Sequence, residues 1–181
     1  MRQLALTAIG EDRPGIVAAV CRVVFEAGGN LRDTSMTILS GQFAMIVVVG
    51  VEPSLDLRTL DRAFDPVRKE LGIEVFVREL SPSHLEAALG AEAEMALVQV
   101  MGPDRPGIVY RVADAMAKRS INISDVETRL AGDAAKPLYV VLMEVCLPPS
   151  VEAAALASDL AELGRELAVE ITVRPVRTST L

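Results

Sequence analysis

The sequence predicts an α+β fold built from two tandem βαββαβ units, each an antiparallel four-stranded sheet with two helices on one face. Three observations predict it. The length of 181 residues suits two small domains. An eight-residue motif at 10–17 returns at 102–109. Strand-like and helix-like hydrophobic patterns then follow each motif in the same order. Each element can therefore be justified in the first repeat and checked in the second.

The repeated motif sets the register of the duplication. Gly-Glu-Asp-Arg-Pro-Gly-Ile-Val at 10–17 becomes Gly-Pro-Asp-Arg-Pro-Gly-Ile-Val at 102–109, so only the second position differs. The same spacing matches further pairs: Val20 with Val112, Asn30 with Asn122, Leu31 with Ile123, and Asp33 with Asp125. After a short insertion around 132–136, we expect residues 43–49 to align with 138–144.

The first half of the first repeat reads as a strand followed by a helix. Residues 4–9 are rich in apolar residues, and Pro14-Gly15 marks a turn after them. A single apolar stripe then follows at helical spacing: Ile16, Val17, Val20, Val23, Val24 and Ala27. Gly28-Gly29 supplies the stop signal.

The second half reads as a hairpin, a helix and a closing strand. Residues 30–39 and 42–51 predict two strands, which Ser40-Gly41 should join in a tight antiparallel turn. One helix is expected over 56–71, and its buried side carries Leu57, Leu60, Phe64, Val67 and Leu71. Residues 74–78 then form the last strand.

The second repeat follows the same order. Its strands are expected at 95–101, 121–130, 138–147 and 169–173. Its first helix places Ile108, Val109, Val112, Ala115 and Met116 inward, and its second, over 151–167, places Leu156, Leu160, Leu163 and Leu167. The expected domains are 1–80 and 95–176, with a linker at 81–94 and a tail at 177–181.

A βαββαβ unit is the ferredoxin-like arrangement, whose two helices leave the other sheet face uncovered. Residues 43–51 are apolar at nearly every position, which predicts burial on both faces. We therefore expect contact with the other repeat or with another chain, and a homodimer.

Composition and charge exclude several classes of protein. The net charge of −7 disfavours direct nucleic-acid binding, which needs a basic face. No segment is long and apolar enough for a membrane span, and the N-terminus lacks a signal-peptide pattern. Cys21 and Cys146 lie among apolar neighbours and make a poor disulfide framework. We expect a cytoplasmic protein with no membrane contact.

The loop Asp-Arg-Pro-Gly between strand and helix can bind an anion. Asp12 and Asp104 are expected to cap the helix, with Pro14 and Pro106 in its first turn. Gly15 and Gly107 let a ligand approach the backbone, whose free amides attract a carboxylate. Asn30 and Asn122 could form hydrogen bonds with the ammonium and carboxylate groups of one amino acid. The alternative is that these residues are only a helix cap and a turn. Repetition of the whole motif favours binding.

These residues resemble the signature of ACT domains: Asp12-Arg13-Pro14-Gly15-Ile16-Val17, followed by Asn30-Leu31. Two such domains without a catalytic module resemble the glycine cleavage system transcriptional repressor family. The resemblance implies binding of a small amino acid, glycine or similar, at interfaces between ACT units. It also implies control of a transcription factor by protein contact. The implied ligand-binding residues are Asp12, Arg13, Pro14, Gly15, Ile16, Asn30, Leu31, Asp104, Arg105, Pro106, Gly107, Ile108, Asn122 and Ile123.

Other functions have less support in the sequence. The single histidine, His84, falls in the expected linker, and Cys21 and Cys146 are expected to be small buried hydrophobic residues, so we expect no enzyme activity. One His and two distant Cys give no zinc spacing, and no cofactor is expected. A regulatory subunit of a metabolic enzyme is a second candidate. RNA binding would need exposed aromatics on the central strands, where only Phe43 and Tyr139 are available.

Overall fold

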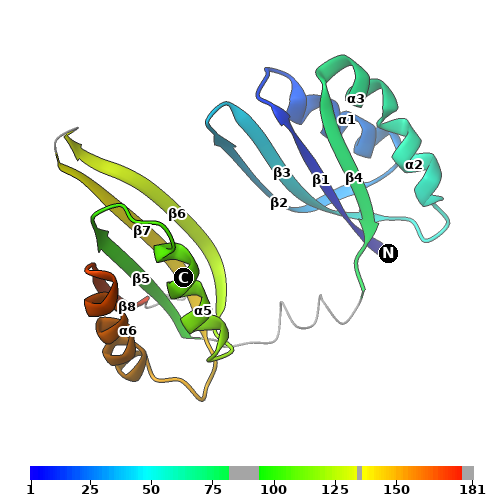
Figure 1. Cartoon of the computed structure of the whole chain (residues 1–181). Coiled ribbons are helices and arrows are strands. Elements are labelled where there is room, and N and C mark those ends of the chain that lie inside the picture. The colour runs from blue at the N-terminus through cyan, green and yellow to red at the C-terminus, as the bar shows by residue number, and fades with distance from the viewer. Residues whose placement is uncertain (82–93, 134–135, 177–181) are drawn as a thin grey trace. The chain divides into compact units, whose positions relative to one another are not determined.

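The chain divides into two compact units, Met1–Ala91 and Glu92–Leu181, in a computed structural model that describes residues 1–81, 94–133 and 136–176 (Figure 1). The expected tail at 177–181, nearly all of the expected linker at 81–94, and His84 within it lie outside the described residues.

The first unit has the predicted order of elements. They are β1 (Arg2–Glu11), α1 (Ile16–Glu26), β2 (Asn30–Leu39), β3 (Gln42–Val51), α2 (Leu57–Ala63), α3 (Asp65–Leu71) and β4 (Ile73–Glu79). The sheet order is β2-β3-β1-β4, and all neighbours are antiparallel. The expected fold class is confirmed, and β2 and β4 are the edge strands.

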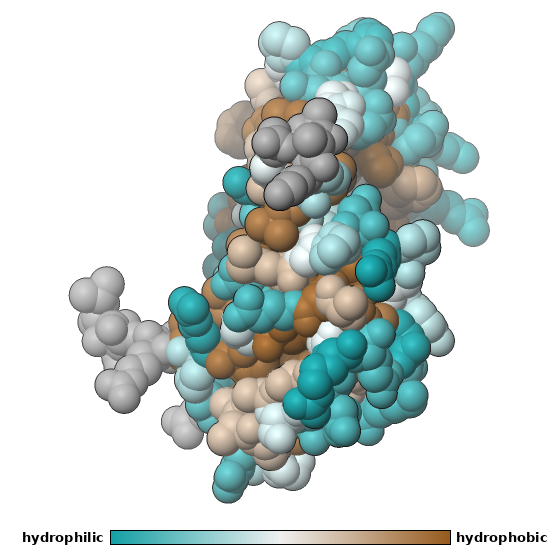
Figure 2. All heavy atoms as spheres, turned by 60° about the vertical axis from the view of Figure 1, so that its left-hand side comes forward, coloured by the Kyte–Doolittle hydropathy of each residue, from teal (hydrophilic) through white to brown (hydrophobic). Residues whose placement is uncertain are grey.

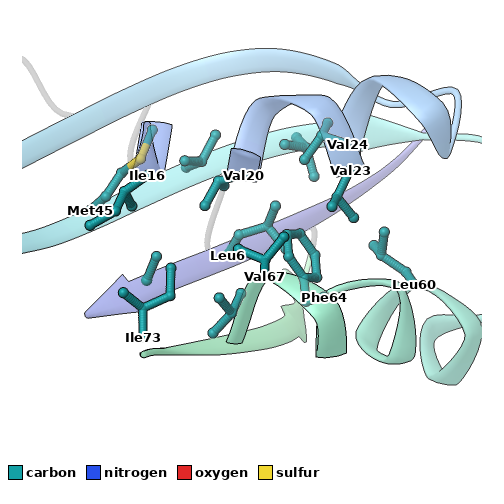
Figure 3. Close-up of a cluster of buried hydrophobic side chains, with 14 of the residues drawn as sticks. Leu6, Ile16, Val20, Val23, Val24, Met45, Leu60, Phe64, Val67 and Ile73 are labelled. Carbon is teal, nitrogen blue, oxygen red and sulfur yellow. The ribbon is translucent and has the colours of Figure 1, made fainter. Parts of the chain in front are cut away.

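The second unit repeats this topology. Its elements are β5 (Glu94–Gly102), α5 (Ile108–Ala117), β6 (Asn122–Asp133), β7 (Lys136–Leu147), α6 (Ala153–Leu167) and β8 (Glu170–Val176), with sheet order β6-β7-β5-β8. In each unit the helices pack on one face of the sheet and enclose a core of aliphatic side chains. Figure 3 shows how Val20 and Val24 of α1 and Phe64 and Val67 meet Leu6 of β1 in the first core.

The hairpin between β2 and β3 forms as predicted. Ser40 and Gly41 both have positive φ, 51° and 77°, which is the conformation of a type I′ turn. The two strands leave this turn with Leu39 opposite Gln42.

The helix expected over 56–71 is interrupted, and this expectation was wrong. It consists of α2 and α3, which meet at Phe64. Pro66 lies in the first turn of α3, and within a continuous helix its ring would displace the hydrogen bond to Arg62. Phe64 and Val67 are nevertheless both buried, because the break keeps the apolar side facing the sheet.

The expected alignment of 43–49 with 138–144 is wrong by one residue. Gly10 lies opposite Phe43, and Gly102 lies opposite Tyr139. The returning strands therefore correspond at a spacing of 96 residues (139 − 43), whereas the motifs correspond at 92 (102 − 10). A shift of one residue would turn each side chain to the opposite face of the sheet.

The prediction that β3 is buried on both faces does not hold within the described unit. Its burial alternates, and the side away from the helices is open: Ile46 is 54% exposed. Ile9 and Phe76, on the same face, are 45% and 59% exposed. Apolar residues reach the surface of the chain in patches between hydrophilic ones (Figure 2).

Both outer strands next to the hairpins are irregular near their starts. The pairing of β2 with β3 shifts between Leu31 and Asp33, and the pairing of β6 with β7 shifts between Ile123 and Asp125. Each shift is a β-bulge, in which one extra residue sits on the edge strand. Arg32 and Ser124 are these extra residues.

Candidate ligand site at the glycine corners

Each unit turns from its first strand into its first helix through a glycine with left-handed backbone. Gly15 has φ 98° and ψ −11°, and Gly107 has φ 93° and ψ −3°. Each is the N-cap residue of its helix, and Ile16 and Ile108 behind them are buried. We call these two turns, residues 12–16 and 104–108, the glycine corners. A residue with a Cβ would be strained at either glycine.

The expected roles of the neighbouring residues were wrong in detail. No side chain accepts a hydrogen bond from the helix N-terminus at either corner, so Asp12 and Asp104 are not the caps. Pro14 and Pro106 precede the N-cap and are outside the first helical turn. The glycine itself is the cap because its left-handed conformation turns the chain within one residue. The first helical amides consequently keep no side-chain partner.

The corners are open to solvent. A Cβ atom built on Gly15 or Gly107 would meet no atom within 4 Å. The Asp, Arg, Pro and Gly residues of both corners are exposed. The Arg13 guanidinium donates to Glu11 at 3.0 Å, and the Asp12 backbone amide donates to the Gly41 carbonyl at 2.9 Å. The first corner is thereby fixed to the β2–β3 turn without being covered.

An open groove of about 510 Å³ adjoins the first corner. Besides 12–16, its lining comes from α1 and from the two hairpin strands: Val17, Ala18, Cys21, Met36 and Phe43. Val17 was expected in the buried stripe and is 40% exposed, and Cys21, expected to be buried, is half-buried. Sequence reasoning did not assign these five residues to the site. Met36, an exposed apolar residue between Ser35 and Thr37 on β2, is the signal that could have indicated it.

The second corner has the same backbone but different surroundings. By position in the repeat, Tyr110 replaces Ala18, Thr128 replaces Met36, and Tyr139 replaces Phe43. Tyr110 is 68% exposed. Three hydroxyl-bearing side chains thus stand where the first unit has apolar ones.

The two asparagines do not lie beside the corner of their own unit. Asn30 begins β2 opposite Gly50, which also pairs with Gln3 near the start of β1, whereas the first corner follows the end of β1. Eight strand residues separate the two levels, roughly 26 Å. Asn122 begins β6 in the same way. Asn30 and Asn122 are exposed, Leu31 is 38% exposed, and Ile123 is half-buried. A site that combines corner and asparagine therefore needs two units.

The described residues contain no group of three or more His, Cys, Asp or Glu side chains that could hold a metal ion. Cys146, expected to be buried, is half-buried, and its thiol lies 3.4 Å from the Met95 sulfur. Within the same ranges, no helix is both long and apolar enough to cross a membrane.

Comparison with known proteins gives both sequence and structural relatives. Residues 2–78 and 94–174 match the ACT domain profile. A UPF0237 protein of Methanocaldococcus jannaschii is 37% identical over 79 residues, which are 43% of this chain and 88% of that protein. A UPF0237 protein of Corynebacterium glutamicum is 36% identical over 74 residues, 40% and 83% of the two chains. Each of these matches is about as long as one unit.

Two solved structures resemble nearly the whole chain. An unknown protein from Galdieria sulphuraria has a TM-score of 0.81 and 25% identity, and covers 97% of this chain and 99% of its own. A protein provisionally assigned as a glycine cleavage system transcriptional repressor has a TM-score of 0.71 and 21% identity, with 98% of both chains covered. At that identity the second likeness shows the fold.

Fold and corners together define the class: a duplicated ferredoxin-like module in which each unit carries one glycine corner. The chain belongs to the ACT domain family and contains two ACT domains in tandem.

Proposed function

We propose that this chain binds a small amino acid, glycine or similar, at contacts between ACT units and controls a transcriptional regulator by protein–protein contact. The observation that carries the proposal is the pair of open glycine corners with no side-chain cap. A helix N-terminus with free amides attracts a carboxylate through hydrogen bonds and the aligned peptide dipoles.

The ligand would bridge two units. Its carboxylate would approach the amides behind Gly15 or Gly107, and its ammonium group would meet Asn30 or Asn122 of a neighbouring unit. Since the asparagine and the corner lie at opposite ends of each unit, occupancy would favour the assembled arrangement over the free one. That difference in affinity is what a sensor needs in order to regulate.

The affinity should be modest. Glycine has five non-hydrogen atoms, and a ceiling of about −1.5 kcal/mol per atom limits the dissociation constant to roughly micromolar. Such a value suits the detection of an abundant metabolite.

The test is calorimetry of the full chain with a panel of free amino acids. Gly15→Ala and Gly107→Ala place a methyl group in the corners and should weaken binding at least about tenfold. Gly28→Ala is the matched control, because Gly28 also has positive φ, 71°, and also has no atom within 4 Å of a built Cβ, but lies at the other end of α1. All three substitutions strain the backbone, but only those at Gly15 and Gly107 should weaken ligand binding.

Absence of heat with every amino acid would remove the sensing function. Equal loss of affinity in Gly15→Ala and Gly28→Ala would show an effect of strain alone. Asn30→Ala and Asn122→Ala test the second half of the site, and unchanged affinity in both would exclude the asparagines.

The partner can be tested by affinity purification from cells with and without the bound amino acid. A transcription factor, identified by mass spectrometry and released or retained by the ligand, is the expected result. A metabolic enzyme in its place would make the chain a regulatory subunit and would overturn the transcriptional part of the proposal.

A further inference from the structure

The face of the first sheet that points away from its own helices has an ordered arrangement of side chains. The strand register places them in three rows that cross the sheet from β2 to β4. The central row is Ser35, Ile46, Thr7 and Phe76; one flanking row is Thr37, Ala44, Ile9 and Glu74, and the other is Asp33, Val48, Ala5 and Arg78. The two inner strands contribute no charged residue to these rows.

If a two-fold axis runs along the central row, these rows are complementary to the same rows of a second chain. The rotation would place each flanking row of one chain against the opposite flanking row of a second chain. The large Ile9 would then face the small Ala5, and Glu74 would face Arg78. Phe76 would lie on the axis against its own equivalent, where paired aromatic rings are favourable.

The two charged side chains are unpaired among the described residues. Neither the Glu74 carboxylate nor the Arg78 guanidinium has an ion-pair or hydrogen-bond partner there, and both residues are exposed. The same strand residues in the second unit, Glu170 and Arg174, also flank an open-face residue, Thr172. The last strand of each unit therefore has the same alternation of charge.

The second sheet is poorly suited to pair with itself. Its central row contains Glu127 and Gln99, so the same rotation would place Glu127 against its own equivalent. Glu144 adds a charge on the inner strand β7 of that face. The first unit, whose inner strands contribute no charge to the three rows, is better suited to pair with itself.

We propose that the open face of the first ACT domain is a dimerisation surface that packs against the same face of a second copy of this chain, antiparallel and centred on Phe76. Three rows of four residues give twelve per chain, fewer than the roughly 20–30 per side of a stable interface. The dimer is therefore weak and concentration-dependent. Aligned sheets pack about 10 Å apart at an angle near 30°. The Glu74 and Arg78 side chains are long enough to meet across that distance and angle.

The first experiment is analytical ultracentrifugation of the full chain, without amino acid, over a range of concentrations. The wild type should show a reversible monomer–dimer equilibrium. Phe76→Glu places two like charges on the axis and should raise the dimer dissociation constant at least about tenfold. Thr172→Glu, the same position in the second unit, is the matched control and should change it less than about twofold. Circular dichroism checks that each variant is folded.

The second experiment reverses the charges. Glu74→Arg alone opposes two cations across the interface and should weaken the dimer about tenfold. Adding Arg78→Glu restores both pairs and should recover the wild-type constant within about threefold. The double variant would instead repel Glu170 and Arg174 if the first unit bound the second unit of another chain.

A wild type that stays monomeric at every concentration overturns the proposal, as does a dimer that is insensitive to Phe76→Glu. A double variant whose dimer is weaker than that of Glu74→Arg also overturns it, and would favour a contact between unlike units. Since no amino acid is present, these outcomes are independent of the proposed ligand site.

Discussion

At the scale of single residues, the first glycine of each repeated motif has a packing role. A Cβ built on Gly10 would lie 2.7 Å from Ile73 Cγ2 and 3.0 Å from Ile73 Cα. On Gly102 it would lie 2.7 Å from Val169 Cγ1 and 3.0 Å from Val169 Cα. In both units the first strand therefore passes directly against the backbone at the start of the last strand, which leaves no room for a side chain.

Gly10→Ala should lower the free energy of unfolding by about 1–3 kcal/mol, since the backbone of Ile73 must shift to admit the methyl group. Chemical denaturation followed by circular dichroism measures the change. Gly50→Ala is the control: the nearest atoms to its built Cβ would be Arg32 Nε and Met1 Cε, both at 3.2 Å, and these ends of long side chains can move away. Equal effects of the two substitutions would contradict this account of Gly10.

At the scale of elements, one arginine joins the interrupted helices to the last strand. Arg68 on α3 donates to the Asp61 carbonyl at 2.7 Å, to Asp65 Oδ1 at 2.9 Å and to the Val75 carbonyl of β4 at 2.6 Å, and it also pairs with the Asp61 carboxylate. Burial alone would lower the pKa of Arg68, but the hydrogen bonds to Asp61 and Asp65 outweigh it and raise that pKa. The guanidinium thus links α2, α3 and β4 at the point where Pro66 prevents a continuous helix.

Arg68→Ala should destabilise the first unit by about 1–3 kcal/mol, because it leaves the Val75 carbonyl and the Asp61 carboxylate without their donor. Arg68→Lys should fall between alanine and wild type, since an ammonium group lacks the planar fork. Thermal unfolding of both variants measures the effect. The exposed Arg62 on α2 provides the control, and Arg62→Ala should stay within about 0.5 kcal/mol of wild type.

Element order and type could be predicted because the apolar spacing of the strands and helices is regular. Ser40-Gly41 is a clear turn signal, and the motif at 10–17 identifies the duplication. The helix break at Phe64 was missed because Leu60, Phe64 and Val67 keep helical spacing across it. The one-residue misalignment of β7 arose because its residues are apolar on both faces, so periodicity could not fix the register.

At the scale of the whole molecule, the duplication gave two corners with the same backbone and unequal linings. Their positions could be predicted from the repeated Asp-Arg-Pro-Gly. The apolar groove could not, because Met36 and Phe43 reach the corner only through the pairing of β2 with β3. The separation of Asn30 from the corner could not be predicted either, because it depends on the antiparallel course of β2 after α1.

If both corners bind, calorimetry should resolve two sites with different amino-acid preferences. The first groove, with Met36 and Phe43, should favour an apolar side chain, whereas Tyr110 and Thr128 beside the second corner should favour a polar one. Gly15→Ala should then abolish binding at the site that prefers apolar amino acids, and Gly107→Ala should abolish binding at the site that prefers polar ones. Identical isotherms for the two variants would mean that the linings do not discriminate.

The bulges at Arg32 and Ser124 bear on how the chain avoids aggregation. Strands β2 and β6 are edge strands whose side chains are almost all exposed, and such edges can template the addition of foreign strands into growing fibrils. An extra residue locally increases the twist and interrupts the ladder. On β2 the bulge therefore confines the regular geometry that a foreign strand could extend to residues 33–39.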